Sequence, residues 1–105
     1  MAKAAQAPTM EALRARREDI LRVASAHGVR NVRVFGSVAR GESGSGSDVD
    51  LLVDGSGRLS TFGQAALQSE LEDLLGCPVH VTTTAGLRPA REHIREEIEG
   101  EAVAL

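Results

Sequence analysis

The chain has 105 residues, 42% of them hydrophobic and only 2% aromatic, and carries a formal net charge of −3. This length fits one domain, and with no Trp or Tyr the core must be built from aliphatic side chains. The negative charge argues against a long nucleic-acid track, which would need clustered positive charge.

The single cysteine, Cys77, excludes an internal disulfide and a cysteine-based zinc cluster. A lone cysteine also suits a reducing compartment. The first residues hold no continuous apolar run, and no stretch approaches the length of a membrane span. We therefore expect a cytoplasmic protein that contacts neither membrane nor nucleic acid directly.

The first residues, 1–9, are small and polar and are expected to be disordered, so that a single domain covers residues 10–105. A helix is predicted over about residues 10–27, with Thr9 as its N-cap and Gly28 ending it. Its apolar stripe consists of Leu13, Ile20, Leu21 and Ala24.

Two strands with a turn and a loop between them are predicted next. The run NVRVF, residues 31–35, reads as a strand with both valines on one face, and residues 36–42 read as a tight turn into a short helix. Residues 43–47, SGSGS, predict a flexible loop, and residues 48–54, DVDLLVD, a second strand. Alternation along that strand places Val49, Leu51 and Val53 on one face and Asp48, Asp50 and Leu52 on the other.

The second half of the chain repeats the alternation of helix and strand. Residues 55–59 predict a turn, and residues 61–75 a helix that ends at Gly76 and carries leucines at helical spacing. Residues 77–83 predict a third strand with Pro78 at its start, where a missing N–H is tolerated.

The last elements are a helix over about residues 89–99, with Ile94 and Ile98 pointing inward, and a segment, 102–105, that is either a short strand or a packed tail. The order α-β-α-β-α-β-α predicts an α/β fold with a small mixed β-sheet of about three to four strands, flanked by helices in two or three layers. The acidic run Glu96, Glu97, Glu99 and Glu101 is expected to form a solvated face.

Two aspartates of the second strand form a candidate metal site. Asp48 and Asp50 share a strand face at a spacing of about 6.5–7 Å. Two carboxylates this close can bridge a hard divalent cation, and Mg²⁺ suits the pair because it keeps its waters and binds phosphate oxygens. Asp54 shares their face but lies about 13 Å from Asp48, too far to join them.

The residues before these aspartates form a candidate anion site. Gly36 ends a strand and Ser37 opens a helix, so backbone N–H groups can approach an anion closely. Arg40, one turn later, can fork onto phosphate oxygens, and Ser47 offers another hydroxyl next to the metal pair. An anion site beside a metal pair fits a nucleoside triphosphate bound with magnesium.

The run GSVARGESGSGSDVD resembles the signature of the nucleotidyltransferase superfamily to which DNA polymerase beta belongs: a Gly-Ser pair, a ten-residue gap and Asp-x-Asp. More closely, the chain resembles the minimal nucleotidyltransferase (MNT) domains, which act as antitoxins beside HEPN-domain toxins. The segments RVFGSVARGE, SDVDLLV, LEDLLG and IREE fall in the expected order. The resemblance implies a polymerase-beta-like core that uses ATP and one or two Mg²⁺ ions, held by Asp48 and Asp50.

One position departs from the family pattern. Relatives carry a third carboxylate on the next strand, whereas the corresponding run here, PVHVTT, has His80. Imidazole is a poor ligand for magnesium, but it could act as a general base near neutral pH. Three interpretations stay open: His80 is a third catalytic residue beside the two aspartates, it marks lost catalysis, or it is a strand histidine without a role.

The resemblance implies a hetero-oligomer in which this chain transfers AMP from ATP to a tyrosine of a HEPN ribonuclease toxin and so neutralises it. Because the chain has no tyrosine, such a label must lie on the partner. A first alternative is a binding module that neutralises the toxin by complex formation. A second is a nucleotidyltransferase for a small molecule such as an aminoglycoside, which usually needs a larger acceptor domain.

Overall fold

The computed structural model describes residues 8–44, 46–55, 60–87 and 92–105. Parts of four predicted elements lie outside these residues: residues 1–7 of the N-terminal segment, residue 45 of the loop, 56–59 of the turn, and 89–91 at the start of the last helix. The described helices are α1 (Met10–Ala15), α2 (Arg17–Ala26), α3 (Gly36–Arg40), α4 (Thr61–Leu75), α5 (Thr84–Leu87) and α6 (Glu92–Glu101). The described strands are β1 (Val29–Phe35), β2 (Val49–Gly55), β3 (Val79–Thr83) and β4 (Val103–Ala104).

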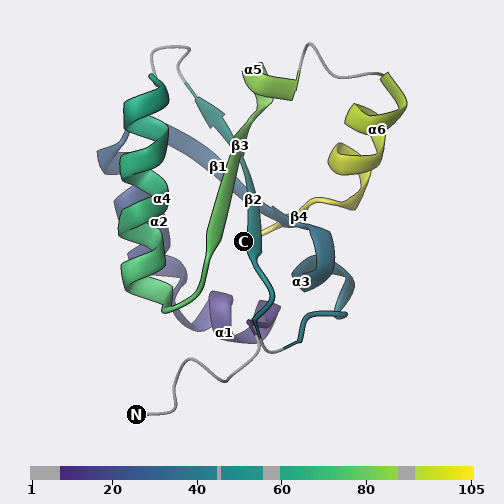
Figure 1. Cartoon of the computed structure of the whole chain (residues 1–105), viewed down its shortest axis with the longest axis horizontal. Coiled ribbons are helices and arrows are strands. Elements are labelled where there is room, and N and C mark those ends of the chain that lie inside the picture. The colour runs from purple at the N-terminus through teal and green to yellow at the C-terminus, as the bar shows by residue number, and fades with distance from the viewer. Residues whose placement is uncertain (1–7, 45, 56–59, 88–91) are drawn as a thin grey trace.

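The strands form a mixed sheet in the order β3-β2-β1-β4. β1 runs antiparallel to both β2 and β4, whereas β2 and β3 are parallel and are joined through α4. Helices α2 and α4 pack together on one side of the sheet, and α3 and α6 lie on the other side (Figure 1). The prediction of a small mixed sheet flanked by helices is confirmed. No helix among the described residues is long and apolar enough to cross a membrane.

The core lies between the sheet and the pair α2 and α4, and it is aliphatic as predicted. Ile20, Leu51, Leu67 and Leu71 are among its largest fully buried side chains. Leu52, on the opposite face of β2, is also fully buried. β2 is therefore covered on both faces, as befits a strand inside the sheet.

The predicted helix over residues 10–27 is wrong as one element, because α1 and α2 are separated at Arg16. Arg16 leaves the helical conformation, with φ −108° and ψ 15°. Between the buried side chains of Leu13 and Ile20, the chain carries Arg16 and Arg17, and both are exposed. No apolar side chain anchors that turn to the core. The predicted N-cap is confirmed, since Thr9 Oγ accepts from the Ala12 N–H at 3.0 Å.

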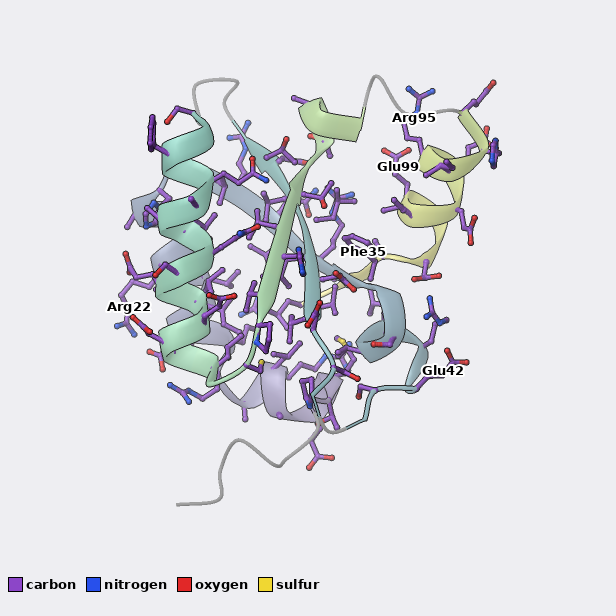
Figure 2. The ribbon with its side chains drawn as sticks, viewed as in Figure 1. Arg22, Phe35, Glu42, Arg95 and Glu99 are labelled. Carbon is purple, nitrogen blue, oxygen red and sulfur yellow. The ribbon has the colours of Figure 1, made fainter. Side chains whose placement is uncertain are left out.

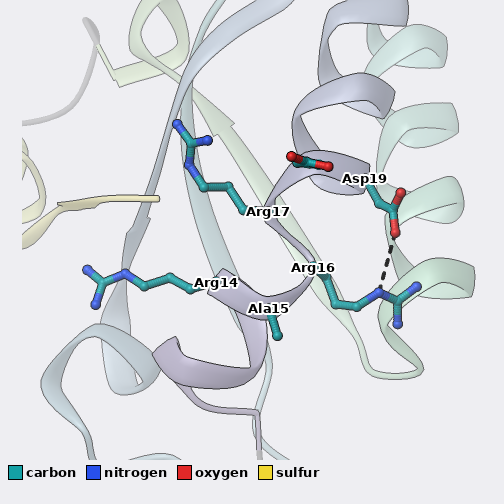
Figure 3. A pocket seen from close by; sticks show the side chains of 6 residues that line it. Arg14, Ala15, Arg16, Arg17 and Asp19 are labelled. Atoms are coloured by element: carbon teal, nitrogen blue, oxygen red, sulfur yellow. Dashed lines mark ion pairs between the residues drawn. The ribbon is translucent and has the colours of Figure 1, made fainter.

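The break gathers charged side chains around an open hollow of about 360 Å³ (Figure 3). Within it Arg16 Nε lies 3.6 Å from Asp19 Oδ2. Arg17 reaches the other way, and its Nε donates to the carbonyl oxygen of Leu105 at 3.2 Å. The broken helix thus contributes a contact that holds the described C-terminal end against the body of the domain.

The outer edge of the sheet at β3 is bonded by side chains from α4. Val79 N–H donates to Glu72 Oε2 at 3.0 Å, and Val81 N–H donates to Gln68 Oε1 at 2.8 Å. Gln64 Nε2 in turn donates to the Val81 carbonyl. These three α4 residues are spaced four apart and so lie along one face of the helix. They give three backbone groups of β3, the N–H of Val79 and both the N–H and the carbonyl of Val81, partners that another strand would otherwise supply.

The C-terminal region differs from the prediction in three respects. The short helix α5 was not predicted, and α6 runs to Glu101 rather than to residue 99. Ile94 is 42% exposed, so its inward placement is wrong, whereas Ile98 is partly buried. Of the two alternatives for residues 102–105, the strand is found: β4 pairs with β1, and the Leu105 N–H donates to Val32 O at 3.2 Å.

Strand β1 begins at Val29, two residues before the prediction, and a bulge interrupts its pairing with β2. Asn31 has a φ of +55°, and the register of pairing with β2 shifts between Arg30 and Arg33. Asp54 of β2 holds this irregular segment: its carboxylate accepts from Asn31 Nδ2 at 2.9 Å and from Arg33 Nη2 at 2.7 Å. The hydrogen bond from Asn31, aided by the charge of Arg33, lowers the pKa of Asp54.

We expect Asp54→Asn to lower the free energy of unfolding by up to about 1 kcal/mol near pH 7, because Asp54 is partly exposed and such pairs contribute little more. A carboxylate with a lowered pKa stabilises the fold above its ordinary pKa, and this contribution is lost as the pH falls through the lowered value. The difference should therefore disappear in strong acid. Urea unfolding at neutral and acidic pH measures the difference in stability between Asp54→Asn and wild type. Asp73→Asn, at an exposed position of α4, is the control. An equal difference at both pH values would contradict the prediction.

Candidate functional site

The end of β1 and the start of α3 lie directly against Asp50. Pairing of β1 with β2 places Phe35 opposite Asp50, so Gly36, the next residue, comes beside the same carboxylate. Gly36 has a φ of +77°, and a Cβ atom built on it would lie 2.3 Å from Asp50 Oδ2. Only glycine fits here, both for its backbone conformation and for the space. The predicted adjacency of the Gly-Ser turn and the aspartate pair is present in the structure.

Asp50 is a partly buried carboxylate surrounded by other charges. Burial raises its pKa, with Asp48 acting in the same direction, while the charge of His80 acts in the opposite one. Burial and a second carboxylate nearby both destabilise the charged form of a carboxylate, and a bound cation stabilises it. This environment fits a hard divalent metal ion such as Mg²⁺.

His80 lies on the same side of the sheet as the aspartates. Val79 and Val81 are buried and His80 is exposed, as the alternation predicted, and the parallel register pairs His80 with Asp50. Its Nε2 lies 3.1 Å from Asp48 Oδ2. The structure therefore brings His80 to Asp48, just before the start of β2.

Two carboxylates, Glu42 and Glu101, hold Arg40. Arg40 Nε donates to Glu42 Oε1 at 2.7 Å, and Arg40 Nη1 donates to Glu101 Oε1 at 2.9 Å. The same Glu101 oxygen accepts from the Gly36 N–H at 2.6 Å. Glu101 was expected on a solvated face, and that prediction is wrong, since its side chain is only 22% exposed. Nothing in the local sequence separates it from the other glutamates of α6, because its partners lie more than sixty residues earlier.

The two predicted serines occupy different surroundings. Ser37 is in the first turn of α3, and its carbonyl accepts from the Glu42 N–H at 2.8 Å. Ser47 Oγ accepts from the Gly44 N–H at 2.8 Å, and its own N–H donates to Gly44 O at 3.0 Å. Ser47 therefore shapes the turn that leads into Asp48.

The site offers a cation an incomplete set of ligands. Within the described ranges, no group of three or more His, Cys, Asp or Glu residues is arranged to hold a metal ion. The chain supplies two carboxylates, which suit magnesium in kind, and leaves the other ligand positions to water or to a phosphate.

The sequence matches the family described as the nucleotidyltransferase domain over residues 17–105. It is 40% identical over 73 residues to protein adenylyltransferase MntA of Thermococcus cleftensis, covering 68% of this chain and 74% of that protein. It is 38% identical over 77 residues to a protein of Methanocaldococcus jannaschii assigned as a protein adenylyltransferase, covering 73% of this chain and 80% of that protein.

Solved structures give the same answer for the fold. A structure assigned as a minimal nucleotidyltransferase superposes with a TM-score of 0.78 at 42% identity, covering 93% of this chain and 97% of that one. A toxin–antitoxin complex crystallised with AMP-PNP contains a chain that superposes with a TM-score of 0.69 at 19% identity, covering 83% of this chain and 69% of that one. With the Gly-Ser turn against the aspartate pair, these matches show that the chain is a nucleotidyltransferase and belongs to the family of nucleotidyltransferase domains.

Proposed function

We propose that this chain is the antitoxin of a toxin–antitoxin pair and transfers AMP from MgATP to a tyrosine hydroxyl of a partner HEPN ribonuclease toxin. The adenylyltransferase names of its relatives and the toxin–antitoxin structures with its fold support this role. The observation that carries it is the close approach of Gly36 to the Asp50 carboxylate, which brings the residues proposed to bind phosphate beside those proposed to bind metal. The pair would act in the cytoplasm as a hetero-oligomer.

In this reaction the acceptor oxygen forms a bond to the α-phosphorus, the bond from that phosphorus to the bridging oxygen breaks, and pyrophosphate leaves. Asp48 and Asp50 would hold one or two magnesium ions. When bound, magnesium supplies positive charge that offsets the charge of the phosphates. The Gly36 N–H, the Ser37 hydroxyl and the Arg40 guanidinium would bind and orient phosphate oxygens, with Ser47 shaping the loop beside them.

The acceptor proton needs a base, and His80 is placed to provide one. If its Nε2 carries the proton and donates to Asp48, Nδ1 keeps a free lone pair. An imidazole oriented by a carboxylate in this way is suited to act as a general base. This arrangement gives the histidine a function that differs from the metal binding of a third carboxylate.

The experiment that tests the proposal is intact-mass measurement of the partner protein after incubation with this chain and MgATP. We expect the partner to gain one or more adenylyl units, with the label on tyrosine in peptide mapping. Asp50→Asn serves as the inactive control. No mass gain with the wild-type chain, while the two proteins still form a complex, would contradict enzymatic transfer.

A second candidate function is neutralisation by binding alone, and the incomplete ligand set together with His80 at the third position favours it. The same experiment with His80→Asp separates the two. Transfer by the wild-type chain supports the enzymatic proposal, since histidine then suffices. Transfer only with the aspartate variant would show an intact site whose natural form acts by complex formation.

A further inference from the structure

The side chain of Glu101 occupies the donors that the proposed function assigns to phosphate. Its Oε1 accepts from the Gly36 N–H at 2.6 Å and from Arg40 Nη1 at 2.9 Å. Both donors belong to the anion site beside Asp50. We propose that Glu101 is an internal phosphate mimic, which fills the phosphate position of the ligand-free chain and is displaced when the nucleotide binds; this inference rests on the proposed nucleotide site.

The geometry makes the two occupants mutually exclusive. A charged carboxylate oxygen and a phosphate oxygen are acceptors of the same kind, and each forms short, charge-assisted bonds to N–H donors. Gly36 has a single N–H, so while Glu101 accepts from it at 2.6 Å no phosphate oxygen can take the same bond. The phosphate must therefore replace Glu101 rather than bind beside it.

The charges around Arg40 point the same way. Its guanidinium lies between the carboxylates of Glu42 and Glu101, at 2.7 and 2.9 Å, so its positive charge is already matched in the ligand-free chain. Asp48 and Asp50 add two more carboxylates nearby. A free anion entering this site meets an excess of negative charge. Removing the Glu101 charge should therefore strengthen the binding of a polyphosphate.

The displacement needs only a side-chain movement. Glu101 is the last residue of α6, and the chain after it is fixed: β4 pairs with β1, and Leu105 bonds to Val32 and Arg17. Because its side chain is 22% exposed, Glu101 can rotate toward solvent without release of this tail. Before the nucleotide binds, the hydrogen bond to Glu101 keeps the Arg40 guanidinium oriented toward the phosphate position.

The matched control lies two residues earlier on the same helix. Glu99 is exposed and carries the same charge (Figure 2). It points about 200° away from Glu101 around the helix axis, since successive residues turn by about 100°. Glu101→Ala and Glu99→Ala therefore remove equal charge from nearby positions in sequence, but only the first empties the anion site. Glu101→Gln removes the charge while keeping an oxygen that can accept.

The test is titration calorimetry of each variant with AMP-PNP and magnesium, without the partner, together with melting of the ligand-free proteins. We expect Glu101→Ala to bind about tenfold more tightly than wild type, a gain of about 1.4 kcal/mol. The affinity of Glu101→Gln should lie between those of Glu101→Ala and wild type, and the affinity of Glu99→Ala should equal that of wild type. The ligand-free melting temperature should fall for Glu101→Ala, because the contact to α3 is lost; a purely structural role predicts this fall without any gain in affinity.

Equal or weaker binding by Glu101→Ala, when wild type binds measurably, overturns the internal mimic and leaves the proposed function standing. Absence of binding in wild type and in both Glu101 variants overturns the nucleotide site itself, and the mimic with it. A gain shared by Glu99→Ala would assign the effect to the general charge of α6 and would also overturn the proposal.

Discussion

Gly36→Ala should reduce AMP transfer by about 10²- to 10³-fold, a loss of the size seen when a positioned group is removed from an active site. The new methyl group would lie 2.3 Å from Asp50 Oδ2. Since real Cβ atoms do not approach so closely, either the Asp50 carboxylate or the backbone of α3 must move. Both belong to the proposed site, so its two halves would separate.

Gly36→Ala also strains the backbone, and a control variant separates this loss of stability from the effect on the site. Alanine at a φ of +77° is strained by about 1 kcal/mol or more, whatever the space around it. Gly76, at the end of α4, has a φ of +72°, and a Cβ atom added there would meet no other atom within 4 Å. Gly76→Ala should therefore lose similar stability and keep its transfer rate. Thermal melting and intact-mass kinetics measure the two effects; full transfer by Gly36→Ala would disprove the assignment of this turn.

Asp50→Asn should reduce transfer by about 10²- to 10³-fold while leaving the fold at least as stable. The amide has the shape of the carboxylate but lacks the charge that a magnesium ion requires. Because burial raises the pKa of Asp50, its charged form costs folding free energy at neutral pH. A neutral side chain removes that cost.

For Asp50→Asn we therefore expect transfer to fall while stability is kept or rises, and the experiment measures both. Transfer to the partner is followed by intact mass, and stability by urea unfolding near neutral pH. Asp54→Asn is the comparison, since it removes a carboxylate of the same strand that is engaged with Asn31 and Arg33, and should lower stability while sparing transfer. Retained transfer by Asp50→Asn would remove Asp50 from the metal site.

Those parts of the fold that depend on local pattern could be predicted from the sequence. Helix α4 has the predicted bounds because its leucines recur at helical spacing and Gly76 ends it in the left-handed conformation. The Gly-Ser turn and Asp50 were predicted together because their motif lies within fifteen residues of sequence. Strand alternation likewise placed His80 opposite the buried faces of Val79 and Val81.

What could not be predicted depends on contacts between distant parts of the chain. Glu101 reads like any other glutamate of an acidic helix until β4 pairs with β1 and brings it to Gly36. The break at Arg16 separates Leu13, the buried residue of α1, from Ile20 and Ala24, the buried residues of α2, and the apolar stripe in the sequence does not reveal it. Ile94 illustrates the reverse error, since periodicity alone cannot tell whether anything covers an apolar position.

The side chains that α4 extends along β3 also limit how this protein can meet others. A bare strand at a sheet margin invites a further strand, from a partner's extended segment or from a second copy, and such addition is a common start of aggregation. Gln64, Gln68 and Glu72 already bond the N–H groups of Val79 and Val81 and the carbonyl of Val81. A further strand could pair with β3 only after these hydrogen bonds had been broken. Strand addition at the β3 edge is therefore disfavoured, and recognition there would proceed through side chains; the opposite edge of the sheet, at β4, has no such cover from α4 among the described residues.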